Sequence, residues 1–289
     1  MNEGGDPTAG VVPEMMLHKN LLPANFKPQT KHSIGRVGMY HFDMSSTVTG
    51  DTWISAYAAV QTALTATEAA MALKPAYLPA ATNGVESGTL ATFALIRPPG
   101  HHATTNLCGG YCYLNNVIIC ASHVLRQHVD LKVVIVDVDF HHGNGVEEIL
   151  AREDTDKWRK RCKYISLHAH PDYPYYTTHL PTPLAKDVTA NEYIEKLHAS
   201  LKEAEKWCDA DTFVLVSLGL DTLAGDPIGG FAGFKGQGDY SRIGNEIGVF
   251  AKQVRARSCF LLEGGYVVDR LGECVEGVFR GFIHAVTNN

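Results

Sequence analysis

Two apolar, largely β-branched runs constrain the fold of this chain most: VVIV at 133–136 and TFVLVSL at 212–218. Unbroken apolar runs of this length are typical of strands that are buried on both faces. Further strands are predicted at 89–96, 163–167 and 258–262. Helical apolar spacing predicts helices at 51–73, 114–128, 146–152, 188–208, 239–257 and from about 269 onward. Alternating strands and helices predict the α/β class, a single three-layer α/β/α domain with a mainly parallel sheet.

The length and apolar content favour a single core. With 289 residues and 45% hydrophobic content, the chain can bury one large core, and α/β folds of this size often remain one domain. Residues 1–35 are rich in Gly, Pro, Asn and Lys without sustained periodicity, which predicts a poorly ordered or atypical N-terminal segment. One folded domain is expected over 36–289.

Charge and cysteine content narrow the functional classes. A net charge of −6 argues against direct nucleic-acid binding. No apolar run approaches the ~20 residues of a membrane helix, and the N-terminus lacks the basic and apolar regions of a signal peptide. Seven cysteines without a CxxC pair favour a reducing compartment over a disulfide framework. We therefore expect a cytoplasmic protein, or a nuclear one in a eukaryote, with no membrane partner.

Every unusual polar cluster follows one of the predicted strands. These clusters are His101-His102, 137–142, 166–168, Asp221 with Asp226, and 263–266. Ligands of parallel sheets bind outside the carboxyl ends of the strands, so clusters far apart in sequence are expected to converge there. A helix cap or a turn would explain any single cluster, but not all of them together.

The converging residues suit metal-assisted hydrolysis. Asp139, His141 and Asp221 supply three ligands of a catalytic metal, and a hydrogen-bonded buried network is the structural alternative. A histidine of the 101–102 pair can move a proton, and Tyr266, beside a Gly-Gly pair, can donate a hydrogen bond to a developing oxyanion. Together these groups predict hydrolysis of an amide.

Five motifs then carry a family resemblance. RPPGHHA at 97–103, GGYCYLNN at 109–116, DVDFHHGNG at 137–145, GLDTLAGDP at 219–227 and EGGY at 263–266 resemble the histone deacetylase and acetylpolyamine amidohydrolase superfamily. The resemblance implies the arginase/deacetylase fold, with a sheet of about eight strands, and a deacetylase-like catalytic domain over 36–289. The arginase branch, with two manganese ions, fits less well because Leu223 and Gly143 stand where aspartates would be expected.

The resemblance also implies roles in the reaction. Asp139, His141 and Asp221 match the zinc ligands, with iron(II) as the alternative metal. His102 matches the general base and acid, and His101 an electrostatic support.

Further matches surround these groups. Asp137 and Asn144 match partners of the two histidines, and Tyr266 matches the residue that stabilises the oxyanion. The substrate channel is expected to contain Gly110, Tyr111, Tyr176 and Ile228. A structural potassium ion is expected at Asp137, Asp139, His141, Ser166 and Leu167.

The sequence departs from the family pattern in two places that bear on the activity. Residues 1–50 give no confident match, and the 177–192 segment is shorter than usual and lacks the customary glycine-rich loop. The first hypothesis is a zinc-dependent deacetylase acting on acetyl-lysine proteins or acetylpolyamines. The alternative is a catalytically weak acyl-lysine-binding or interaction subunit that keeps the fold. Acyl-chain length, native metal and oligomeric state, including a homodimer, are left open by the sequence.

Overall fold

The computed structural model describes residues 33–72, 91–152, 157–169, 184–208 and 211–288. Its core is a parallel sheet with the strand order β1-β5-β4-β2-β3. The strands are β1 (Ala91–Ala94), β2 (Lys132–Asp137), β3 (Cys162–Ser166), β4 (Thr212–Leu218) and β5 (Arg257–Leu262). The α-helices are α1 (Ser33–Met39), α2 (Thr52–Ala72), α3 (Asn116–Gln127), α4 (Asn144–Ala151), α5 (Ala190–Glu205), α6 (Gln237–Gln253) and α7 (Leu271–Thr287). Short 3-10 helices occupy η3 (Lys157–Arg161) and η4 (Val268–Arg270).

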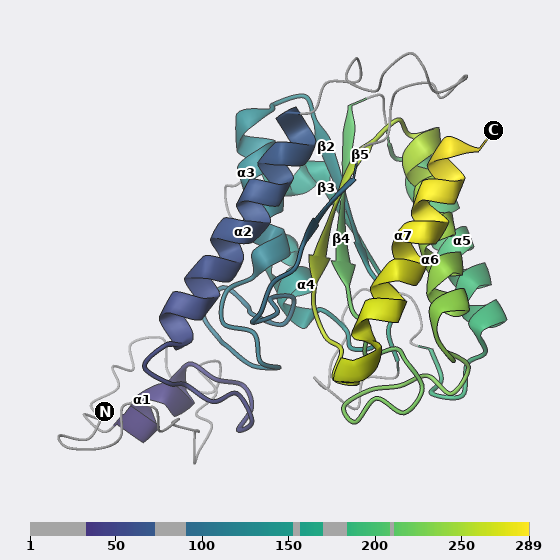
Figure 1. Cartoon of the computed structure of the whole chain (residues 1–289). Coiled ribbons are helices and arrows are strands. Elements are labelled where there is room, and N and C mark those ends of the chain that lie inside the picture. The colour runs from purple at the N-terminus through teal and green to yellow at the C-terminus, as the bar shows by residue number, and fades with distance from the viewer. Residues whose placement is uncertain (1–32, 73–90, 153–156, 170–183, 209–210, 289) are drawn as a thin grey trace.

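The helices form a layer on each face of the sheet. Figure 1 shows α2, α3 and α4 on one side and α5, α6 and α7 on the other. The predicted α/β class and three-layer arrangement are therefore confirmed. The predicted division at residue 36 falls inside α1, while residues 1–32 lie outside the described part of the chain, so that division stays a prediction.

The expectation of about eight strands was wrong, because the described residues form a five-stranded sheet. The sequence itself supplies five apolar runs, and each becomes a strand; the higher number came from the resemblance alone. Among the described residues beyond β3, Ala169 and Leu184 form an isolated parallel bridge. After Leu184 the chain turns, and the Val188 N–H donates to the Ala185 carbonyl at 3.1 Å.

The central strands are buried because their side chains are apolar on both faces. Residues 133–136 of β2 and 213–216 of β4 are fully buried, between α3 on one face and the α5–α7 layer on the other. Beside them, the ring of Phe260 in β5 packs against Phe279 and Phe282 of α7, at centroid distances of 5.1 and 5.3 Å. Burial of this kind removes apolar area from water and holds the sheet rigid.

The strand register brings the functional loops together. Asp137, the last residue of β2, pairs with Ser166 of β3 and Ser217 of β4, so these three strands end at the same level. The loops that follow β1, β2, β4 and β5 therefore leave the same edge of the sheet. In the part of the chain that the structure describes, no helix is long and apolar enough to cross a membrane.

Candidate metal centre and active site

Asp139, His141 and Asp221 form a compact group at the carboxyl end of the sheet. Their ligand atoms all lie within 4.8 Å of one another. The Nδ1 of His141 is 2.8 Å from Asp221 Oδ2 and 3.4 Å from Asp139 Oδ1. The two carboxylate side chains are each 1% exposed. Buried carboxylates at this separation repel each other and need a cation to compensate them.

Backbone groups fix the orientation of the two carboxylates. The Asp221 Oδ1 accepts from the Phe140 N–H at 3.0 Å, and the Asp139 Oδ1 accepts from the His141 N–H at 2.9 Å. The Asp139 Oδ2 accepts from the Gly264 N–H, also at 2.9 Å. A Cβ on Gly264 would lie 2.7 Å from Asp221 Oδ2 and 2.8 Å from Asp139 Oδ2, so only glycine fits here without displacing them.

The electrostatics of this group also favour a cation. Burial and the adjacent Asp139 carboxylate raise the pKa of Asp221 above its ordinary value. Burial alone would lower the pKa of His141, but hydrogen bonds and the charges of Asp139 and Asp221 raise that pKa to about 10. Two carboxylate oxygens and one imidazole nitrogen, with His141 facing the pocket, suit zinc or iron(II).

The two adjacent histidines differ in their partners. The Nδ1 of His101 is 3.0 Å from Asp137 Oδ2, and the Nδ1 of His102 is 2.8 Å from the amide Oδ1 of Asn144. An amide oxygen only accepts, so His102 carries its proton on Nδ1, and its Nε2 can accept another proton.

The pKa shifts separate the two rings further. Burial lowers the pKa of His101, but the carboxylates of Asp139 and Asp137 outweigh it and raise that pKa well above the ordinary value. For His102, burial and the neighbouring His101 and His141 hold the pKa well below its ordinary value. These shifts favour the neutral form of His102 and the charged form of His101, while the catalytic roles that the resemblance implies for the two rings stay predictions.

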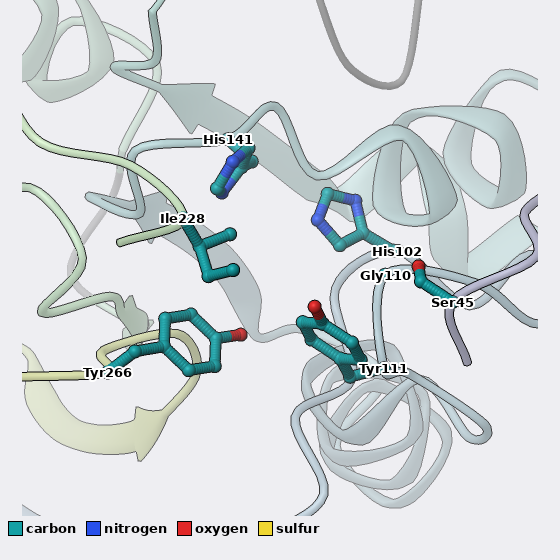
Figure 2. Close-up of a pocket in the computed structure, with 7 residues that line it drawn as sticks. All are labelled: Ser45, His102, Gly110, Tyr111, His141, Ile228 and Tyr266. Carbon is teal, nitrogen blue, oxygen red and sulfur yellow. The ribbon is translucent and has the colours of Figure 1, made fainter. Parts of the chain in front are cut away.

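The pocket of about 220 Å³ is lined by Ser45, His102, Gly110, Tyr111, His141, Ile228 and Tyr266. The Tyr111 and Tyr266 rings meet edge to face, with centroids 5.8 Å apart. Figure 2 shows the Tyr266 hydroxyl pointing into the space that His102 and His141 border. Burial, followed by the charges of Asp139 and Asp221, raises the pKa of Tyr266, so its phenol stays protonated and can donate a hydrogen bond.

One pocket wall depends on a segment that the sequence left unassigned. Gly110 and Tyr111 both adopt positive φ angles, +55° and +63°, a conformation rarely found in tyrosine. Their N–H groups donate to Asp43 Oδ2 and Ser46 Oγ, and the Ser46 N–H and hydroxyl donate to Asp43. The DMSS pattern at 43–46 is typical of an Asx turn and could have indicated the turn, but not its contact with Gly110 and Tyr111.

Two further supports were not predicted as site residues. The buried Glu263 accepts through Oε2 from the N–H groups of Gly100 at 2.7 Å and His101 at 3.1 Å, which fixes the backbone under the histidine pair. The Tyr164 hydroxyl donates to Asp137 Oδ2 at 2.8 Å, beside the bond from His101. Glu263 lies in the EGGY motif, but Tyr164 carried no signal in the sequence beyond its place in a predicted strand.

The structure brings together most of the predicted site residues. Those that meet around the pocket or in direct contact with its lining are His101, His102, Gly110, Tyr111, Asp137, Asp139, His141, Asn144, Asp221, Ile228 and Tyr266. Tyr176 and residues 177–183 lie outside the described part of the chain. Ser166 lies beside Asp137 in the sheet, and its hydroxyl contacts His168 Nδ1 at 2.8 Å; the potassium site stays a prediction.

Comparisons with known proteins show what the sequence and the fold of this chain are similar to. Residues 24–282 match the family model described as the histone deacetylase domain. Acetylpolyamine amidohydrolase 1 of Pseudomonas aeruginosa is 32% identical over 265 residues, which cover 86% of this chain and 68% of that protein. Human histone deacetylase 9 is 33% identical over 169 residues, which cover 51% of this chain and 16% of that protein. The crystal structure of an acetylpolyamine aminohydrolase from Burkholderia pseudomallei superposes with a TM-score of 0.77 at 25% identity, covering 96% of this chain and 74% of that one.

Proposed function

This chain belongs to the histone deacetylase domain family, and from that premise we propose that it hydrolyses N-acetylated amines in the pocket of His102, His141 and Tyr266. One observation carries the proposal: a three-ligand group, a neutral histidine and a phenol donor meet at one cavity. Relatives that carry acetylpolyamine amidohydrolase and histone deacetylase names support a deacetylase. Amide hydrolysis needs a nucleophile, a proton carrier and an oxyanion donor, and each has a candidate here.

Zinc is the metal that we propose for Asp139, His141 and Asp221, with iron(II) as the alternative. When bound, such a metal polarises a carbonyl group and lowers the pKa of a water molecule towards neutrality. The histone deacetylase domain match supports a metal-dependent hydrolase, and the donor set supports a single divalent ion with open positions.

The protein side chains would carry the proton transfers. His102 Nε2 accepts a proton from the attacking water while its Nδ1–H stays bonded to Asn144. Water adds to the carbonyl carbon, and the Tyr266 hydroxyl donates to the resulting oxyanion. The C–N bond then breaks as His102 returns the proton to the leaving nitrogen, which releases acetate and an amine.

The substrate class follows from the same site. An acetylpolyamine and an acetyl-lysine side chain both present an acetamide on an aliphatic stem. The pocket is lined by aromatic and apolar surface from Tyr111, Tyr266 and Ile228, which suits such a stem. We propose acetylated amines as the class, in a reducing compartment of cytoplasmic type, which the seven free cysteine thiols support.

The test compares N-acetylputrescine, N8-acetylspermidine and an acetyl-lysine peptide as substrates of the zinc-loaded protein. Wild-type protein is expected to release acetate from at least one of them. Tyr266→Phe is expected to lower kcat on the order of 10²- to 10³-fold while zinc stays bound. His102→Ala should also remove turnover without loss of zinc, because His102 is not a ligand. No turnover by wild-type protein with stoichiometric zinc would refute the enzyme and favour an acyl-lysine-binding subunit.

A further inference from the structure

Asp226 connects the pocket rim to the backbone of Tyr266. Its Oδ1 accepts from the N–H groups of Ile228 at 2.9 Å and Gly229 at 3.1 Å. Its Oδ2 accepts from the Tyr266 N–H at 2.8 Å. Asp226 is 7% exposed, so this buried carboxylate is satisfied by backbone donors from two separate loops. Charge-assisted hydrogen bonds of this kind are short and stronger than neutral ones.

Arg97 holds the same segment from the other side. Its guanidinium donates to the Gly265 carbonyl at 2.6 Å and lies 5.5 Å from the centroid of the Tyr266 ring. At that distance the cation is attracted to the aromatic face. The Arg97 side chain therefore contacts both the backbone before Tyr266 and its ring.

The glycine directly before Tyr266 is where such contacts matter. Gly265 has a φ of +133°, and glycine adopts such values without the steric cost that limits other residues. Gly264 is held by its N–H bond to Asp139 and by the Leu220 N–H, which donates to its carbonyl at 2.8 Å, so Gly265 is the residue at which the backbone before Tyr266 could rotate. Because the tyrosine hydroxyl lies at the far end of its side chain, a small backbone rotation moves that hydroxyl substantially.

We propose that Asp226 and Arg97 are positioning residues that keep the Tyr266 hydroxyl aimed into the pocket. This inference rests on the proposed function, in which that hydroxyl stabilises the oxyanion. Misplacement of a catalytic group by about 1 Å costs on the order of 10²-fold in rate. Asp226 and Arg97 would act on turnover through Tyr266, with no contact to the reacting atoms.

The substitution Asp226→Asn tests this directly. An asparagine has a single acceptor oxygen, which can keep the bonds to Ile228 and Gly229 only by turning its NH₂ towards the Tyr266 N–H. We expect kcat to fall on the order of 10- to 100-fold, with little change in KM and unchanged zinc content. Asp239→Asn is the matched control, because Asp239 accepts from the Lys235 N–H at 2.7 Å and does not line the pocket. It should keep wild-type kcat.

A double-mutant cycle with Tyr266→Phe separates positioning from a general structural defect. If Asp226 acts through the hydroxyl, Asp226→Asn should lower kcat no further once the hydroxyl is gone. The same holds for Arg97→Met, and Arg97→Lys should restore part of kcat because lysine can still donate to the Gly265 carbonyl. Additive losses in the Tyr266→Phe background would overturn the proposal, as would a wild-type kcat in Asp226→Asn.

A second readout does not depend on turnover. Loss of a hydrogen bond to a charged acceptor is expected to raise amide hydrogen exchange at Tyr266 at least about tenfold in Asp226→Asn. Exchange in the central strand β4 should stay at the wild-type rate. Inactive wild-type protein would refute the proposed function alone, whereas unchanged exchange at Tyr266 would refute the positioning role whether or not the protein turns over.

Discussion

Gly264→Ala should weaken metal binding while leaving the fold intact. A Cβ at this position would lie 2.7 Å from Asp221 Oδ2 and 2.8 Å from Asp139 Oδ2, where ordinary contacts begin at 3.4 Å. Both oxygens would have to move by about 0.6 to 0.7 Å, while metal–ligand distances tolerate only about 0.2 Å. Disturbing the partners of metal ligands typically costs about 10- to 100-fold in affinity, and we expect zinc binding to weaken by that amount.

The assay is zinc titration of the metal-free protein by calorimetry, with circular dichroism to check the fold. Gly272→Ala is the control, because a Cβ on Gly272, in the first turn of α7, would contact nothing within 4 Å. That variant should bind zinc like the wild type and be stabilised by up to about 1 kcal/mol, since alanine favours a helix over glycine. A folded Gly264→Ala protein with wild-type zinc affinity would refute this account of the site.

Three further predictions address pH dependence, stability and metal removal. His101 in the folded state has a pKa above its unfolded value of 6.5, so its ion pair with Asp137 contributes fully below pH 6.5 and is lost as pH rises through the folded pKa. In metal-free protein, the loss of stability of Asp137→Asn relative to the wild type should therefore be largest below pH 6.5. A difference in urea midpoint between wild type and variant that grows as pH rises would contradict this. Phe260→Ala should lower the unfolding free energy by about 3 to 5 kcal/mol, because Phe260 is fully buried against α7. A loss below about 1 kcal/mol in urea denaturation would show instead that the core around residue 260 repacks. Chelation should lower Tm, and zinc at about 100 times its Kd should restore about 2.7 kcal/mol, whereas a Tm independent of zinc would argue against a metal site in the native state.

The residues of the candidate site could be predicted because they lie next to strands that the sequence itself indicates. Asp137, Asp139 and His141 follow a run that can only be buried, and Asp221 follows another, so a parallel sheet necessarily brings them to one edge. The supports of these groups could not be found in this way. Asp43 reaches Gly110 from 67 positions away, and Glu263 reaches Gly100 from 163 away, contacts that local pattern does not encode.

The sequence by itself determined the α/β class, the three layers, the order of the strand segments along the chain, and the residues that we propose as metal ligands and proton-transfer groups. These features follow from local periodicity and from residue chemistry, which are properties of short stretches. Only the tertiary structure decided the strand count, the different pKa shifts of His101 and His102, and the connection of Asp226 to Tyr266. Each of these depends on burial and on distances between loops that follow different strands. Those distances are set only when the helices pack on the sheet and the loops pack against one another at its edge.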